Sequence, residues 1–144
     1  MQITRQADYA VRAVLCLAKH GPSERVTTAQ IGREQHIPQT FLAKIMARLS
    51  VAGIVHSTRG SHGGMSLARP ADEISLLDIV EAIDGPMRLN ECVSDPGACP
   101  LAQDCSVQAV WRQAQAELVD RLARTNFSQL ASPHVQSEAL FEPA

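Results

Sequence analysis

The chain has 144 residues and a mass of 15.6 kDa, which is enough for one hydrophobic core with an appended element. Apolar residues make up 45% of it but aromatic residues only 3%, so aliphatic side chains must dominate that core. The first residues form no hydrophobic signal core, and Asp8 and Arg12 interrupt the apolar run 7–18. We therefore expect neither export nor a membrane span, and a location in the reducing cytoplasm.

The formal net charge of −2 hides a division between the two halves of the chain. Residues 1–70 carry nine Lys and Arg against three acidic residues, a net charge of +6. Residues 71–144 carry four against twelve, a net charge of −8. This asymmetry favours an N-terminal half that faces a polyanion such as nucleic acid, although two solvated faces of uneven composition would give the same pattern.

Apolar residues at helical spacing predict a first helix over residues 7–19, ended by Gly21 and Pro22. Thr27 and Gln30 have capping-box spacing and predict a second helix through about residue 35. After a tight turn, a third helix is expected from residue 38 to about 52, with Gly53 as its C-cap. Two short helices joined in this way predict a helix-turn-helix, with the later one as recognition helix. The residues that this helix should bury are Phe41, Leu42, Ile45, Met46 and Leu49.

Residues 54–67 form two short extended runs around a glycine-rich tip, which predicts a β-hairpin wing. Side chains at the tip can reach a phosphate or the minor groove, and glycine there permits close backbone approach. The polar face of the recognition helix carries groups that suit base edges and phosphates, although an ordinary solvated face is the alternative. The predicted DNA contacts are Thr28, Gln39, Thr40, Lys44, Arg48, Ser57, Arg59, Gly60 and His62.

The second half of the chain predicts two more helices. Ser75 and Asp78 cap one, and Gly85 and Pro86 end it. A long helix follows over about residues 104–126, and at roughly 35 Å it is too long for a small domain to cover alone. Its apolar face comprises Val107, Val110, Trp111, Ala114, Leu118 and Leu122.

Cys92, Cys99 and Cys105 lie in one acidic loop before this long helix. In a chain without export signals they are better explained as metal or cluster ligands than as disulfide partners. The gaps of six and five residues are wider than the C-x₂₋₄-C pairs of structural zinc, and they suit a loop around a larger group. An iron–sulfur cluster is therefore preferred, with zinc and a thiol redox switch as alternatives. Cys16 is expected to be a small buried hydrophobe.

Other polar residues give weaker signals. Asp8, near the start of the first helix, suits the positive end of the helix dipole. The histidines have no ligand spacing to one another, so no site is assigned to His20, His36, His56 or His134. No serine–histidine–acid or paired-carboxylate arrangement is present, and residues 60–64 lack the lysine of a P-loop. The sequence therefore predicts no enzyme.

Over residues 1–130 the sequence resembles the bacterial winged-helix repressors that include IscR, NsrR and the iron-responsive RirA. The segments 1–12, 37–42, 57–64 and 79–86 carry the likeness, together with the cysteine triplet. The resemblance implies a homodimer in which the long helix crosses to the other subunit and places the cluster near the partner's first helix. It also implies that Cys92, Cys99 and Cys105 ligate the cluster. Asp8 matches the carboxylate that completes a [4Fe–4S] site in the nitric-oxide-sensing branch.

Two departures from the IscR pattern bear on the cluster type. The first cysteine gap is six residues rather than five, and Gln108 stands where that branch has its ligating histidine. A [4Fe–4S] cluster is therefore favoured and a [2Fe–2S] cluster is second. The resulting hypothesis is an iron–sulfur-dependent DNA-binding repressor that senses nitric oxide, iron, or cluster or redox status. The alternatives are a thiol- or zinc-based redox regulator and, in another class, a small iron–sulfur electron carrier.

The expected architecture is mostly α: a winged helix-turn-helix with a two-stranded β wing and a long C-terminal dimerisation helix. The domains would be a DNA-binding domain over 1–86, a cluster loop and dimerisation helix over 87–130, and a tail without regular structure over 131–144. The expected partners are double-stranded DNA with an inverted-repeat operator and a second copy of the chain, with no membrane.

Overall fold

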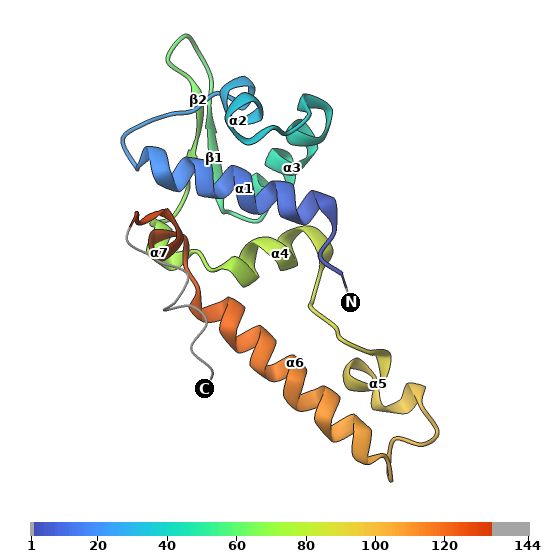
Figure 1. Cartoon of the computed structure of the whole chain (residues 1–144). Coiled ribbons are helices and arrows are strands. Elements are labelled where there is room, and N and C mark those ends of the chain that lie inside the picture. The colour runs from blue at the N-terminus through green and yellow to red at the C-terminus, as the bar shows by residue number, and fades with distance from the viewer. Residues whose placement is uncertain (1, 134–144) are drawn as a thin grey trace.

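The computed structural model of the chain describes residues 2–133, and Figure 1 shows how their elements are arranged. The chain is mostly helical with one antiparallel two-stranded sheet, so the predicted fold class is confirmed. The hairpin, α2 and α3 lie on one side of α1, and α4 and α6 lie on the other (Figure 1). The elements are α1 Arg5–His20, α2 Thr28–Gln35, α3 Gln39–Val51, β1 Val55–Thr58, β2 Gly64–Leu67, η1 Ala71–Glu73, α4 Leu76–Asp84, α5 Glu91–Ser94, η2 Pro96–Ala98, α6 Ser106–Arg124 and α7 Phe127–Ala131.

Side-chain caps explain where the first helices begin. The Thr4 hydroxyl accepts from the Ala7 N–H, so α1 begins two residues earlier than predicted. Thr27 caps α2 in the same way, through the Gln30 N–H at 3.1 Å. The Gln30 side chain donates to Glu34 instead of returning to Thr27, so only half of the predicted capping box forms.

The recognition helix ends at Val51 with Ala52 as its C-cap, so the predicted glycine, Gly53, lies one residue beyond the C-cap. Gly53 has φ 73°, its N–H donates to the Ser50 carbonyl, and the Ile54 N–H donates to the Leu49 carbonyl. This Schellman motif satisfies two of the last carbonyls of α3. The predicted burial of Phe41 is wrong, because its residue surface is 40% exposed. Its ring packs edge-on against the ring of Tyr9 in α1, with ring centroids 5.9 Å apart.

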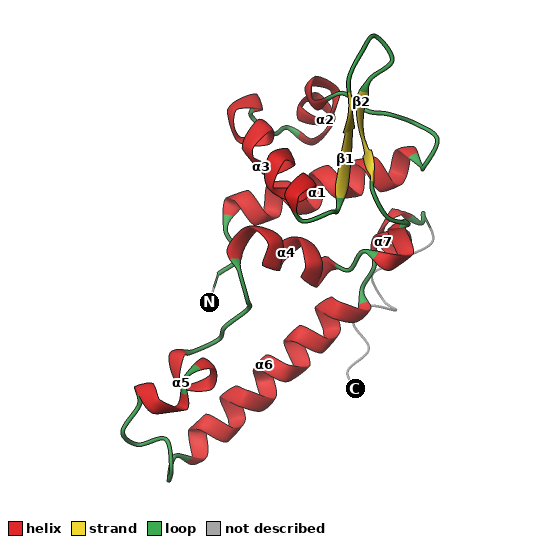
Figure 2. Ribbon diagram, turned by 180° about the vertical axis from the view of Figure 1, so that it is seen from behind, coloured by secondary structure: helices red, strands yellow, loops and turns green. Residues whose placement is uncertain are grey.

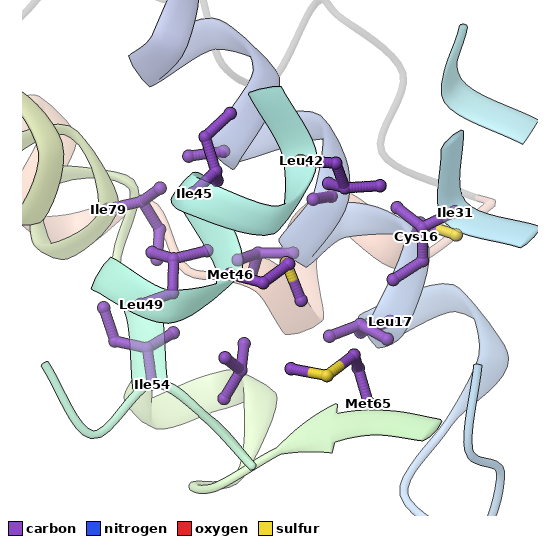
Figure 3. Close-up of a cluster of buried hydrophobic side chains, with 14 of the residues drawn as sticks. Cys16, Leu17, Ile31, Leu42, Ile45, Met46, Leu49, Ile54, Met65 and Ile79 are labelled. Atoms are coloured by element: carbon purple, nitrogen blue, oxygen red, sulfur yellow. The ribbon is translucent and has the colours of Figure 1, made fainter. Parts of the chain in front are cut away.

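The core lies between α1, α3, the hairpin and α4 (Figure 3). The face of α1 that enters it is lined largely by alanines, including Ala7, Ala10 and Ala13, which allow neighbouring elements to approach closely. Leu42, Ile45 and other branched aliphatic side chains fill the space opposite, as expected from a composition poor in aromatic residues. Full burial of each such side chain stabilises the folded state by about 1.5–3 kcal/mol.

The C-terminal segment returns to this core. Helix α6 ends at Arg124, so its 19 residues span about 28 Å, less than predicted. The unpredicted helix α7 then places Phe127 fully inside the core. Asn126 and Gln129 form a capping box, a local signal that is present in the sequence. The predicted tail overlaps the end of α7 at Ala131, and residues 134–144 lie outside the described residues.

Candidate functional site

The exposed face of α3 carries three of the predicted DNA contacts. Gln39, Thr40 and Lys44 are exposed, whereas Leu42 and Ile45 on the opposite face are buried. This is the arrangement that a recognition helix requires, with polar side chains on the solvent side and apolar side chains in the core.

The start of α3 is fixed to the start of α2. The Gln39 amide nitrogen donates to the Thr28 carbonyl oxygen at 3.2 Å. Gly32 makes this close approach possible, because a Cβ there would lie 2.0 Å from the same amide nitrogen. Two predicted contacts, Thr28 and Gln39, are therefore held together across the helix-turn-helix.

Arg48 differs from the other predicted contacts on α3. Its guanidinium donates to the Ile83 carbonyl at 2.7 Å, near the C-terminal end of α4. A cation at this position satisfies a terminal carbonyl and interacts favourably with the helix dipole. Arg48 thus joins α3 to α4 within the chain, a role that the sequence did not indicate.

The wing is an antiparallel hairpin in which Val55 pairs with Leu67 and Thr58 pairs with Gly64. The predicted contacts Ser57, Arg59, Gly60 and His62 are exposed. Gly60 has φ 110°, and the Gly63 N–H closes the tip by donating to the Gly60 carbonyl. A Cβ at Gly63 would lie 2.2 Å from the Thr58 carbonyl oxygen, so the tip requires glycine there.

Arg25 is a wing residue that the sequence did not indicate. Val26 forms two backbone hydrogen bonds with Met65 of β2, which brings the preceding residue to the hairpin. The Arg25 guanidinium donates to the His62 carbonyl at 3.5 Å. The wing therefore carries a second guanidinium close to the tip, from a segment whose position depends on long-range strand pairing.

The cysteine loop lies at the far end of α6 from the body of the molecule (Figure 2). Cys92 is in α5, Cys99 follows η2, and Cys105 is the N-cap of α6. All three thiols are free and half-buried. The Gln108 amide, in a residue only 8% exposed, donates to the Cys92 carbonyl at 2.8 Å and ties α5 to α6.

The loop offers three thiols, a donor set that an iron–sulfur cluster or a zinc ion can take, and their spacing differs from that of a preformed site for one zinc ion. A tetrahedral zinc ion bound at about 2.3 Å would hold its sulfur ligands roughly 3.8 Å apart. Among residues 2–133, the one group of three His, Cys, Asp or Glu ligand atoms within 4.8 Å of one another is Cys16, His20 and Glu34, not the loop cysteines. Free thiols are the donors that an iron–sulfur cluster takes. A cluster is larger than one zinc ion and therefore holds its ligands further apart.

Asp8 is not brought together with the thiols of its own chain. It lies in the first turn of α1, whereas the cysteine loop, which includes α5, lies at the outer end of α6 (Figure 1). Its carboxylate is 60% exposed and forms an ion pair with the Arg12 Nε at 3.2 Å. The other end of that guanidinium donates to the Gln35 carbonyl at 2.7 Å, so Arg12 connects Asp8 to the end of α2.

The outer part of α6 exposes apolar side chains. Val107, Val110 and Trp111 are all more than 40% exposed, and Val110 reaches 62%. Leu118 on the same face is half-buried. Within the described part of the chain, no helix combines the length and apolarity needed to cross a bilayer. A contiguous apolar stripe of this kind marks an interaction surface.

The comparisons with known proteins agree with this architecture. The Rrf2 family, described as an iron-dependent transcriptional regulator, matches residues 3–133. Protein aau3 of Rhizobium meliloti is 36% identical over 116 residues, covering 79% of this chain and 74% of its own. IscR of Vibrio vulnificus is 30% identical over 132 residues, covering 92% and 78%.

Among solved structures, the oxidized form of Staphylococcus aureus CymR superposes with a TM-score of 0.73 at 26% identity. The match covers 94% of this chain and 99% of the CymR chain. The fold, the helix-turn-helix with its wing and these matches lead to one conclusion: the chain belongs to the Rrf2 family of DNA-binding transcriptional regulators.

Proposed function

We propose that this protein is an iron–sulfur-dependent transcriptional repressor that binds DNA as a homodimer. The proposal rests on one observation: the same chain contains a loop with three free thiols and an exposed recognition helix and wing. The Gln108 side chain holds that loop to α6 by a hydrogen bond. The description of its family as iron-dependent supports the same assignment.

The DNA-binding surface would combine α3 and the wing. Gln39, Thr40 and Lys44 would enter the major groove, with the two recognition helices of the dimer about 34–36 Å apart on an inverted repeat. The Thr28 end of α2 would contact the backbone, as helix N-termini do. The wing would contact the backbone or the flanking minor groove through Ser57, Arg59, Gly60 and His62, with Arg25 beside them.

The apolar stripe of α6 would supply the dimer interface, because a second copy of the stripe would cover it. Cys92, Cys99 and Cys105 would hold the cluster, and Asp8 of the partner subunit would complete the ligand set. The bound cluster would supply a reactive iron centre that a signal can alter or remove. Thiolates at the start of α6 would also benefit from the positive end of the helix dipole.

Asp8 provides a route from the cluster loop to the DNA-binding surface. If its carboxylate ligates the cluster, it leaves the Arg12 ion pair, and Arg12 is one of the α1 residues that hold the end of α2, through the Gln35 carbonyl. Movement of α2 is passed to α3 through the Thr28–Gln39 hydrogen bond. Each specific hydrogen-bonded pairing with a base is worth about 1–3 kcal/mol, so a small displacement that breaks a few of them is sufficient for switching.

A second candidate is direct thiol sensing. The three loop cysteines are free and half-buried, and a structural relative, CymR, was crystallised in an oxidized form. Oxidation would then join two of the thiols, with an oxidant as the electron acceptor. An electron carrier is less well supported, because it would need neither the exposed face of α3 nor the wing.

The test is DNA binding before and after cluster removal. An operator is selected from random duplexes with anaerobically purified protein, and its affinity is measured by fluorescence anisotropy at fixed salt. We expect iron chelation to change the affinity at least tenfold. Equal affinity in both states would leave a DNA-binding protein whose cluster does not regulate it. A change produced only by oxidant, in protein without iron, would favour thiol sensing.

A further inference from the structure

A second set of metal-binding groups lies at the junction of α1 and α2, remote from the cysteine loop. Cys16 and His20 are one helical turn apart on α1, and Glu34 comes from the last turn of α2. Their ligand atoms all lie within 4.8 Å of one another. Cys16 Sγ is 3.2 Å and His20 Nε2 is 3.0 Å from the same oxygen, Oε2 of Glu34.

Two further side chains support this group from outside. Glu24 lies 2.8 Å from Nδ1 of His20, so that nitrogen can keep its proton while Nε2 faces the group. The Gln30 amide donates to the other oxygen of Glu34 at 2.8 Å. A carboxylate behind a ligating histidine and a hydrogen bond to a ligating carboxylate are the usual supports of protein metal sites.

The spacing is close to that of a tetrahedral zinc site. Zinc bound at ordinary distances would separate a sulfur and an oxygen ligand by roughly 3.6 Å, and a nitrogen and an oxygen ligand by roughly 3.4 Å. The observed separations are 3.2 and 3.0 Å, so the groups need to open by only a few tenths of an ångström.

Exposure of the group also suits an ion with a water ligand. Cys16 is 1% exposed and forms the buried side of the proposed site, at one edge of the core cluster in Figure 3. The side chains of His20 and Glu34 are 24% and 39% exposed and leave an outer side open to solvent. A water molecule can therefore reach the position that the three side chains leave free.

We propose that Cys16, His20 and Glu34 bind one zinc ion, with water in the fourth position. In the metal-free state the Glu34 oxygen accepts the thiol proton and the imidazolium proton. Zinc would replace these two protons, leaving a thiolate, a neutral imidazole and a carboxylate as ligands. The formal charge of the three groups is zero before binding, and that of the complex is zero afterwards, so no uncompensated charge is buried.

The buried thiol limits which metal can bind. Burial and then the Glu34 hydrogen bond raise the pKa of Cys16 to about 12. Zinc bonds strongly to thiolate whereas magnesium and calcium take oxygen ligands, so the sulfur in this donor set favours zinc. Because the site joins α1 to α2, zinc would fix the first helix of the helix-turn-helix, and through Gln39 the start of α3. The site is independent of the function proposed above.

The experiment uses the full chain with Cys92, Cys99 and Cys105 replaced by serine, and cobalt(II) as a spectroscopic probe. We expect one cobalt per chain with tetrahedral ligand-field bands and a thiolate charge-transfer band, all abolished by zinc. Glu34→Gln and His20→Gln should weaken binding at least tenfold, whereas His56→Gln, on the exposed wing, should not. Free zinc at a concentration about 100 times its Kd should lower the equilibrium constant for unfolding about 100-fold.

Cys16→Ser should abolish the charge-transfer band, but Cys16 is a core residue and this variant can fail to fold. The Glu34 and His20 variants therefore carry the test, and the parent chain provides a second reading: Glu34→Gln should remove one cobalt equivalent from it. Absence of cobalt binding in the folded triple-serine protein would overturn the proposal. So would a thiolate band that Glu34→Gln and His20→Gln leave unchanged.

Discussion

The side-chain amide of Gln108 donates to the main-chain carbonyl of Cys92 at 2.8 Å, across a separation of 16 residues in the sequence. This bond joins the two ends of the segment that contains all three loop thiols. Gln108→Ala should remove it while leaving the body of the molecule unchanged. A hydrogen bond of this kind is worth about 0.5–1.5 kcal/mol, so we expect cluster loss to an iron chelator to become roughly 2- to 12-fold faster.

The matched control is Gln113→Ala on the same helix, whose side chain bonds to Glu117 at the surface. It should leave the rate of cluster loss unchanged. If Gln108→Ala behaves like the control, the loop is held by other contacts and Gln108 does not position the cysteines.

Arg59→Ala should weaken operator binding and reduce the salt dependence of binding. The side chain is exposed at the wing tip, and removing one cation that neutralises a phosphate lowers the slope of log K against log salt by about 1. Anisotropy titrations at several salt concentrations measure both quantities. Arg88→Ala, an exposed arginine between α4 and α5, is the control. If the two variants have equal slopes of log K against log salt, the wing does not contact the DNA backbone.

Val110→Asp should dissociate the proposed homodimer. Val110 is among the most exposed apolar residues of α6, and a carboxylate there would be buried without a partner against a second copy. Sedimentation velocity should show monomers at concentrations where the parent is dimeric. Ala116→Asp introduces the same charge on the opposite face of α6 and should leave the dimer intact. A dimeric Val110→Asp protein would place the interface elsewhere.

The Cys16–His20–Glu34 group should make the stability of the metal-free protein depend on pH. Hydrogen bonds from His20, then Gln30 and Cys16, lower the pKa of Glu34 from 4.5 to about 2. Its contribution is therefore present above pH 4.5 and is lost as the pH falls toward 2. Hydrogen bonds to Glu34 and Glu24 raise the pKa of His20 above 6.5, so that contribution is present below pH 6.5 and is lost at higher pH.

Glu34→Gln should remove the Glu34 contribution and the part of the His20 contribution that comes from Glu34, while the Glu24 hydrogen bond to His20 stays. Urea unfolding with a chelator present, at several pH values, should show the largest deficit in unfolding free energy between pH 4.5 and 6.5. The deficit should shrink on either side of this window. A difference between variant and parent that does not change with pH would mean that these ionisations are not coupled to folding.

The sequence predicted the elements whose signals are local. The Ser75–Asp78 capping box, the glycine that terminates α3 and the glycine-rich hairpin each depend on neighbouring residues, and the structure contains all three, with Gly53 one residue beyond the C-cap. The Asn126–Gln129 capping box of α7 is equally local, but five residues are too few to show helical periodicity, so the sequence does not predict this helix. Phe41 is apolar but lies at the edge of the buried face of α3, so apolarity alone does not predict its exposure.

The surroundings of the predicted site residues are harder to predict from the sequence, because long-range contacts determine them. The exposure of Gln39, Thr40, Lys44 and Arg59 follows from local pattern. The contact between Arg48 and Ile83 and the position of Arg25 beside His62 depend on how distant elements pack. Glu34 likewise joins Cys16 and His20 only when α2 folds against α1, although the i, i+4 spacing of Cys16 and His20 was visible in the sequence.

The most direct test of the iron–sulfur assignment is the iron and acid-labile sulfide content of protein purified without oxygen. A brown protein with about four iron and four sulfide per chain, both lost in Cys92→Ser, Cys99→Ser and Cys105→Ser variants that remain folded, is the predicted result. One zinc per chain in addition would belong to the α1–α2 site. Protein that contains neither iron nor sulfide, yet binds and releases its operator normally, would contradict the account.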